Sequence, residues 1–137
     1  YLQNTAGINN WDLVDCSAHY VLGQSVLDGI NDRKLLFELA GSELMWERRI
    51  AIVSTWILIR SGDIQTTLSL SVILLHNTED LIHKAVGWML RESWKVYSEK
   101  VENFLIEHYD DLPRTTLRYT IERMEETKRK KFLKGDF

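Results

Sequence analysis

Apolar residues recur along this chain at intervals of three and four positions, the spacing of one face of an α-helix. The first such run extends from Trp11 to about Ser25, and Asn9 or Asn10 is suited to cap its start. No stretch alternates strictly between apolar and polar residues for long enough to form a half-buried strand. The pattern therefore predicts an all-α protein.

The same spacing predicts a series of further helices joined by short linkers. Linkers of a few residues place consecutive helices side by side and antiparallel, as in helical bundles and solenoids. We therefore expect antiparallel helical pairs over these residues: 33–40, 42–60, 63–75, 79–95, 98–108, 113–123 and 126–133.

The helix over 42–60 is the most apolar. Ser42 is expected to cap it, with Glu43 in the first turn, where the helix dipole favours an acid. Residues 50–53 and 56–59 are apolar all round, which predicts the central buried helix of the fold.

Glycine and proline are scarce, which also favours helices over strands and tight turns. The chain has seven glycines and one proline in 137 residues. Gly62 followed by Asp63 pairs a helix stop with a new N-cap, and Pro113 suits the first position of a helix.

Length and composition indicate one soluble globular domain over residues 1–137, since 45% of the residues are hydrophobic and 27% are charged. The one cysteine, Cys16, excludes an internal disulfide and favours a reducing, cytoplasmic setting. We interpret it as a small buried residue rather than a nucleophile. The histidines lack the paired spacing of a zinc site and no apolar run has the length of a membrane helix, so we expect neither a metal nor a membrane partner.

A repeated motif is the most informative feature of the sequence. Trp46 and Arg49, like Trp88 and Arg91, form a Trp-x-x-Arg motif, and the two tryptophans lie 42 positions apart. HEAT and armadillo repeats recur at about 40–47 residues. Trp11 precedes Trp46 and is followed by Asp15, one helical turn later. Stacked repeats would align these tryptophans and charges along one concave surface.

Two interpretations of these residues remain open at this point. Tryptophans at helical spacing more often belong to a core than to a site. Three of them with an ionisable neighbour are harder to bury, because an unpaired charge in the interior costs several kcal/mol or is neutralised. A cleft in which Asp15 faces Arg49 between aromatic walls is the alternative.

Four blocks of sequence, in order, resemble the AlkD-type DNA alkylation repair glycosylases: residues 10–15, 46–51, 81–92 and 112–119. This resemblance implies a HEAT-like α-solenoid that holds duplex DNA containing alkylated purines. It implies hydrolysis of the N-glycosidic bond of cationic N3- and N7-alkylated purines, without a metal or any other cofactor.

The resemblance also assigns roles to individual residues. Asp15 matches the catalytic carboxylate, Arg49 the arginine that accompanies it, and Trp11 and Trp88 the aromatic walls beside the lesion. Arg91 matches a residue at the DNA backbone. In addition, Lys84 lies one turn before Trp88 and either reaches the same groove or is an ordinary surface lysine. The resemblance further implies that Arg114 and Arg118 brace the fold.

These residue types suit the implied reaction. A cationic purine is already a good leaving group, and a fixed carboxylate stabilises the oxocarbenium-like sugar that forms as the bond breaks. Indole faces attract cations and so favour the charged base over a normal one. Arg49 is expected to hold the carboxylate or a phosphate through its planar guanidinium.

Charge and length favour a second hypothesis, a HEAT-like module without catalysis that binds a protein partner or undamaged DNA. The net charge is −3, whereas DNA-binding surfaces are usually basic, although residues 114–134 carry eight Lys or Arg against three acids. The family's domain is longer, so we expect residues 1–137 to be its C-terminal portion. An apolar face exposed at the N-terminal side is then expected to favour self-association.

Overall fold

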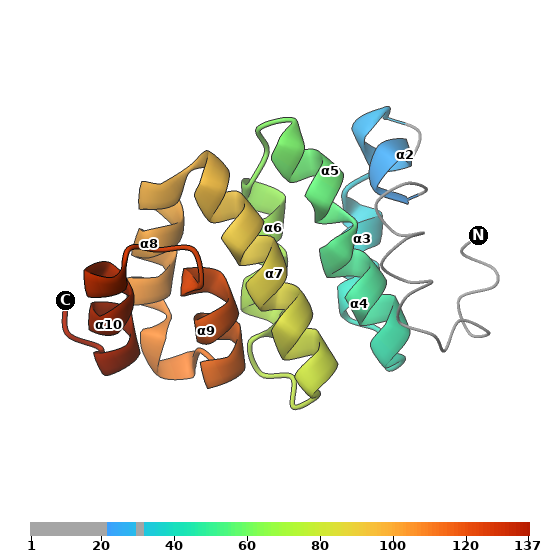
Figure 1. Cartoon of the computed structure of the whole chain (residues 1–137). Helices are drawn as coiled ribbons and strands as arrows, with labels where there is room; N and C mark the ends of the chain where they lie inside the picture. Colours follow the sequence, from blue (N-terminus) through green and yellow to red (C-terminus); the bar gives the residue numbers. More distant parts are fainter. Residues whose placement is uncertain (1–21, 30–31) are drawn as a thin grey trace.

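The computed structural model describes residues 22–29 and 32–137, which are helical throughout with no strand (Figure 1). This confirms the predicted fold class. The predicted helix over 11–25 lies mostly outside the described residues, and its described end belongs to α2 (Gly23–Leu27). The other elements are α3 (Lys34–Ala40), α4 (Met45–Val53), α5 (Thr55–Arg60), α6 (Gln65–Leu74), α7 (Asp80–Val96), α8 (Ser98–Glu107), η3 (Tyr109–Asp111), α9 (Arg114–Ile121) and α10 (Glu126–Lys134). All but α4, α5 and η3 follow the predicted ranges closely.

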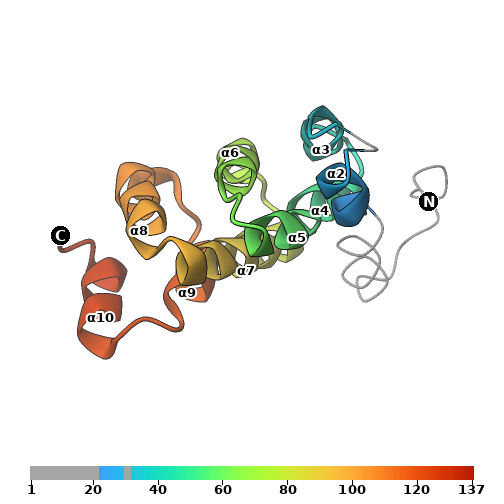
Figure 2. The same cartoon turned by 90° about the horizontal axis from the view of Figure 1, so that it is seen from above.

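The helices form two layers (Figure 2). We call α3, α6 and α8 the outer layer, and α4, α5, α7 and α9 the inner layer. Each outer helix is followed in the chain by an inner one, so the fold is a row of stacked helical pairs. At the C-terminal end of the row, α10 projects beyond the inner layer on the side away from the outer layer.

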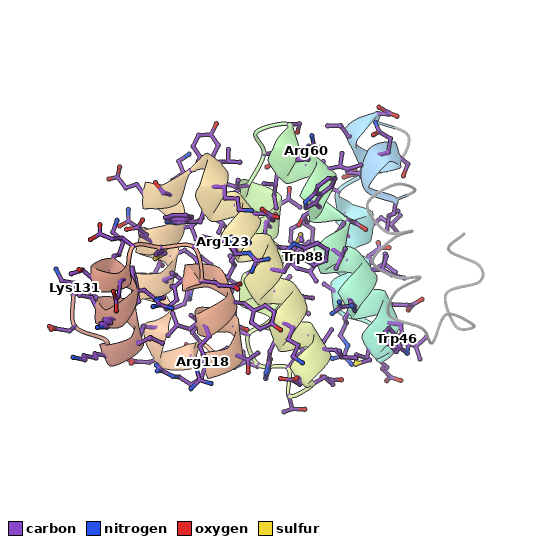
Figure 3. The ribbon with its side chains drawn as sticks, viewed as in Figure 1. Trp46, Arg60, Trp88, Arg118, Arg123 and Lys131 are labelled. Carbon is purple, nitrogen blue, oxygen red and sulfur yellow. The ribbon has the colours of Figure 1, made fainter. Side chains whose placement is uncertain are left out.

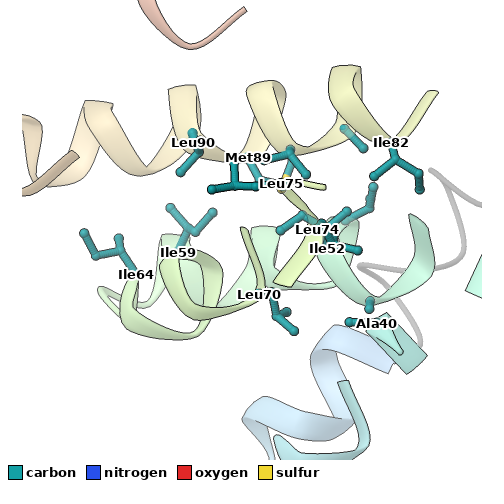
Figure 4. Packing of buried hydrophobic residues seen from close by; sticks show 14 of the residues in the cluster. Ala40, Ile52, Ile59, Ile64, Leu70, Leu74, Leu75, Ile82, Met89 and Leu90 are labelled. Atoms are coloured by element: carbon teal, nitrogen blue, oxygen red, sulfur yellow. The ribbon is translucent and has the colours of Figure 1, made fainter. Parts of the chain in front are cut away.

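The core lies between the two layers, with α7 at its centre. This helix packs against α4, α5, α6, α8 and α9. Figure 4 shows Met89 and Leu90 of α7 near Ile59 and Leu74 from neighbouring helices, and all four side chains are fully buried. Each such side chain contributes about 1.5–3 kcal/mol when it leaves water. The burial of α7 on one face fixes which of its residues face outward.

The predicted helix over 42–60 is divided at Ser54. The Ser54 hydroxyl donates to the Ile50 carbonyl at 2.5 Å, and the Thr55 hydroxyl donates to the Ile52 carbonyl at 2.6 Å. Such bonds compete with the helical ladder and bend helices. A Cβ on Gly23 would lie 2.5 Å from the backbone carbonyl oxygen of Ser54, so α2 approaches the inner layer closely at this bend.

The predicted start of this helix is wrong by two residues, because its N-cap is Leu44 and not Ser42. The helix begins at Met45, and Glu47, not Glu43, is the acid of its first turn. Ser42 precedes the helix: its hydroxyl accepts from the Leu44 N–H at 3.0 Å and donates to the Glu47 carboxylate at 2.6 Å. The buried run predicted within the helix is confirmed for residues 50–53, all fully buried.

The predicted stop and start between α5 and α6 are confirmed. Gly62 has φ +99°, a left-handed conformation that glycine adopts at little cost. The Asp63 carboxylate accepts from the N–H groups of Gln65 at 3.1 Å and Thr66 at 3.5 Å, as an N-cap does. Pro113 stands immediately before α9, one residue earlier than predicted.

None of the helices within the described ranges is both long and apolar enough to cross a membrane.

Candidate functional site

Four of the six predicted site residues lie in the described part of the chain: Arg49, Lys84, Trp88 and Arg91. Trp11 and Asp15 lie outside the described residues, so the predicted pairing of Asp15 with Arg49 stays a prediction. Cys16 lies outside them as well. Among the described residues, no group of three His, Cys, Asp or Glu side chains is placed to hold a metal ion.

One face of α7 carries Lys84, Trp88 and Arg91 and forms part of the exposed surface of the inner layer. The three residues are four and three positions apart, so they follow one stripe of the helix. All three are partly exposed, whereas Ile82, Ala85, Val86, Met89 and Leu90 on the other faces are buried. The burial of α7 in the core thus holds a tryptophan between two cations at the surface.

Arg49 reaches this stripe from α4. It is only 4% exposed, and its Nη1 donates to the Leu81 carbonyl at 2.6 Å. The bond ties α4 to the first turn of α7 and fixes the plane of the guanidinium. Arg49 is also near enough to Lys84 to lower the pKa of that amine by charge repulsion. The structure therefore brings Arg49 and Lys84 together.

Lys84 pairs with a carboxylate on its own helix. Its Nζ lies 3.0 Å from Asp80 Oδ2, and this hydrogen bond is the main reason that the pKa of Lys84 is raised from its ordinary value. Tyr119 of α9 raises the same pKa, in opposition to Arg49. Lys84 consequently stays charged at neutral pH, at the junction of α4, α7 and α9.

Arg91 forms an ion pair between helices. Its Nη1 donates to the carboxylate of Glu122, which directly follows α9. The Arg91 side chain is 18% exposed and that of Glu122 is 56% exposed. The Arg91 Nε is buried, and within the described ranges it has no hydrogen-bond partner. Any other anion that binds the Arg91 Nη1 has to displace the carboxylate of Glu122 or share the donor with it.

The close approach of α9 to α7 beside Trp88 depends on Gly87. A Cβ at this position would lie 2.5 Å from the Tyr119 Cβ and 2.9 Å from the Thr116 carbonyl oxygen. The Thr116 hydroxyl also donates to the His83 carbonyl at 2.9 Å. These contacts place Tyr119 and Glu122 beside the Lys84–Trp88–Arg91 stripe.

The predicted alignment of the tryptophans is wrong for Trp46 and Trp88. The inner helices α4, α7 and α9 begin at residues 45, 80 and 114, so equivalent positions are 35 and 34 residues apart, not 42. Trp46 is the second residue of α4 and Trp88 the ninth of α7 (Figure 3). The two Trp-x-x-Arg motifs therefore lie at different heights in the stack.

A further aromatic residue of the inner layer, Trp56, lies on α5. The guanidinium carbon of Arg60 lies 4.8 Å from the centroid of the Trp56 ring, within cation–π range. The pair borders a hollow of about 380 Å³ between α2 and α5, also lined by Gln24, Leu27, Ile57 and Ser61. The sequence predicted that this part of the helix is buried on every face. That prediction is wrong for α5, because Trp56 and Ile57 are only half-buried.

Sequence reasoning missed Glu122 and Tyr119 as neighbours of the site, because the 42-residue spacing gave the wrong register between helices. The spacing between the first residues of the inner helices α4, α7 and α9 gives the signal that was missed. Arg49, Lys84 and Arg118 are each the fifth residue of their inner helix, with spacings of 35 and 34. A search for cations at this interval would have connected α4, α7 and α9.

The two-layer stack with charged and aromatic residues on its inner layer defines an all-α helical repeat protein. The family model described as DNA alkylation repair enzyme matches residues 1–124. The chain therefore belongs to this family, which confirms the resemblance seen in the sequence and supports a role in DNA repair. Comparisons with curated proteins and with solved structures gave no significant match.

Proposed function

We propose that this protein is a DNA glycosylase that releases cationic N3- and N7-alkylated purines from duplex DNA. The observation that carries the proposal is the family match over residues 1–124, which includes every residue assigned to the site. The four sequence blocks narrow the family's general repair role to this reaction. In this proposal, alkylated duplex DNA is the substrate and no cofactor takes part.

Asp15 is the proposed catalytic carboxylate. The cationic base leaves without strong acid assistance, so the main requirement is to stabilise the positive charge that develops on the sugar. A carboxylate meets this requirement directly, or by orienting the water that attacks the sugar carbon. Arg49 is the proposed partner: its buried guanidinium, fixed by the Leu81 carbonyl, offers a rigid donor for a carboxylate or phosphate.

Trp11 and Trp88 are the proposed walls beside the lesion. Trp88 supports this role because it is half-buried on the inner layer, held in place by the core of α7. Lys84 and Arg91 are each paired with a carboxylate, Asp80 and Glu122 respectively. The two cations flanking Trp88 are thus largely neutralised, which lowers the repulsion that a cationic base would meet on the indole face.

Lys84 and Arg91 are the proposed contacts to the DNA backbone. Both side chains reach the surface of the inner layer, and both hold exposed carboxylates that a phosphate can replace. Exposed ion pairs of this kind are worth at most about 1 kcal/mol, so exchange of a carboxylate for a phosphate costs little.

The test is release of base by the wild-type protein and by Asp15→Asn from a duplex that contains N7-methylguanine. We expect Asp15→Asn to lower the single-turnover rate by at least about a hundredfold, because electrostatic stabilisation is the main catalytic term. Asp12→Asn is the matched control, since it removes the same charge three positions away within the same sequence block. Its rate is expected to stay within a few-fold of wild type.

Equal rates for wild type and Asp15→Asn would remove Asp15 from the mechanism. Duplex binding by the wild type without any base release would contradict the glycosylase proposal and favour the non-catalytic binding module.

A further inference from the structure

Arg118 occupies, on α9, the position that the two site cations occupy on the preceding inner helices. It is the fifth residue of α9, as Lys84 is of α7 and Arg49 of α4. In stacked helical pairs, equivalent positions recur along one face of the stack. The register therefore extends the row of cations from α4 and α7 onto α9.

The exposed stripe of α9 faces the same side as the site. Arg114, Arg118 and Glu122 follow one another at intervals of four residues, and all three are exposed. Glu122 contacts Arg91 of α7, which places Arg118 one turn from that contact. Figure 3 shows Arg118 and Arg123 on the side of the molecule from which Trp88 is seen.

Some neighbouring cations contact other parts of the fold, whereas Arg118 and Arg123 make no such contact with the described residues. Arg114 donates to the Tyr109 hydroxyl at 3.2 Å and to the Leu133 carbonyl at 3.0 Å, so it braces α10 as predicted. Lys128 and Lys130 pair with Glu102 and Glu126. Across the part of the chain that the structure describes, Arg118 and Arg123 are exposed and have no ion pair or hydrogen bond.

We propose that Arg118 and Arg123 bind the phosphates of duplex DNA and carry the DNA-binding surface from α7 across α9 toward α10. The inference rests on the proposed function and adds two contacts that the resemblance did not assign, since it implied a bracing role for Arg118. An exposed guanidinium that supports no other group retains its fork of donors for a phosphate. Binding also releases counterions from the DNA, which makes each contact dependent on salt.

The test compares two variants that each lose two positive charges. Arg118→Gln/Arg123→Gln changes the inner side, and Lys34→Gln/Lys100→Gln changes exposed lysines on the outer-layer helices α3 and α8. Fluorescence anisotropy with an undamaged duplex gives the Kd at several salt concentrations. Thermal melting of each protein checks that it is folded.

We expect the slope of log Kd against log salt to fall by about 1.8 for Arg118→Gln/Arg123→Gln, and the affinity at physiological salt to fall on the order of tenfold. The outer-layer variant should keep the wild-type slope. An unchanged slope for the Arg118/Arg123 variant, or an equal loss in the outer-layer variant, would overturn the inference.

Base release by the wild-type protein, measured in parallel, separates this inference from the proposed function. A reduced slope in the inner-side variant without base release by the wild type supports the DNA surface and contradicts the glycosylase. Base release by the wild type together with an unchanged slope in the inner-side variant supports the glycosylase and contradicts the DNA contacts of Arg118 and Arg123.

Discussion

Arg91 has two possible partners, and the competition between them is the clearest feature at the scale of single residues. In the structure the Arg91 guanidinium binds the carboxylate of Glu122. In the proposed function the same guanidinium binds a DNA phosphate. Glu122 is more than half exposed. If a duplex lies on this surface as we propose, Glu122 weakens its binding in two ways, by occupying Arg91 and by repelling phosphates.

Glu122→Gln is accordingly expected to tighten duplex binding by about two- to fivefold, since an exposed ion pair is worth at most about 1 kcal/mol. Anisotropy with an undamaged duplex at moderate salt measures the change. Glu107→Gln, which removes an exposed acid from the outer-layer helix α8, is the control. Weaker binding by Glu122→Gln would mean that Glu122 positions Arg91 for DNA instead of competing with it.

At the scale of elements, the interface between α7 and α9 determines which residues surround Trp88. Gly87 permits this close interface, because any larger residue would meet the backbone of Thr116 and the Cβ of Tyr119. Backbone atoms do not move aside as a flexible side chain does, so the helices have to separate.

We expect Gly87→Ala to lower the free energy of unfolding by about 1–3 kcal/mol, the usual cost of overpacking. Urea denaturation measures it. Gly41→Ala is the matched control: Gly41 ends α3 with φ −90°, and an added Cβ there has no neighbour nearer than 3.6 Å. A Gly87→Ala protein as stable as Gly41→Ala would show that α7 and α9 are not packed this closely.

A second interface joins α4 to the start of α7. The Arg48 Nη1 and Nη2 donate to the two oxygens of Glu79 at 3.0 and 2.5 Å, and this pairing lowers the pKa of the Glu79 carboxyl. A lowered pKa means that the folded state favours the ionised form. The stabilisation is present above the ordinary glutamic acid pKa and is lost as the pH falls through the lowered value.

Glu79→Gln should therefore be less stable than wild type by up to about 1 kcal/mol at neutral pH. The difference should shrink as the pH falls below the ordinary glutamic acid pKa, and it should vanish once the pH has passed below the lowered pKa that Glu79 has in the folded protein. Chemical denaturation at a series of pH values measures both. Glu43→Gln is the control, because Glu43 has no ion pair with the described residues. A stability difference between wild type and Glu79→Gln that does not vary with pH would contradict the assignment.

The sequence predicted the helices well because periodicity, Gly62 and Pro113 are local signals. It failed at Ser54, where the helix divides, because the division depends on hydroxyl bonds to the preceding turn and on the approach of Gly23 from α2. The start of α4 was misjudged for a similar reason. Ser42 looked like a cap, yet its hydroxyl bonds locally before the helix begins.

The sequence predicted the residues of the candidate site, but not the partners that the structure gives to Arg49, Lys84 and Arg91. The family blocks identified Arg49, Trp88 and Arg91, and the spacing from Trp88 identified Lys84; the structure places all four on inner-layer helices. The partners of these residues depend on how neighbouring helices pack. Sequence spacing alone therefore could not show that Glu122 holds Arg91.

At the scale of the whole molecule, the helical stack separates structural charges from available ones. Residues 114–134 carry a net charge of +5, which leaves −8 for the rest of the chain because the total is −3. Part of this positive charge fixes α10 through the contacts of Arg114 and Lys128. Arg118 and Arg123, which make no such contact with the described residues, lie on the side that carries Trp88. The acidic total is therefore compatible with a basic surface over α9.

The central claim is that the protein cuts the bond between an alkylated purine and its sugar. Mass spectrometry of the small molecules and of the DNA, after incubation of the wild-type protein with a duplex containing N7-methylguanine, tests it directly. We expect free 7-methylguanine and an abasic site in an otherwise intact strand. Recovery of the methylated duplex unchanged, or of guanine still attached to the strand after loss of the methyl group, would contradict it.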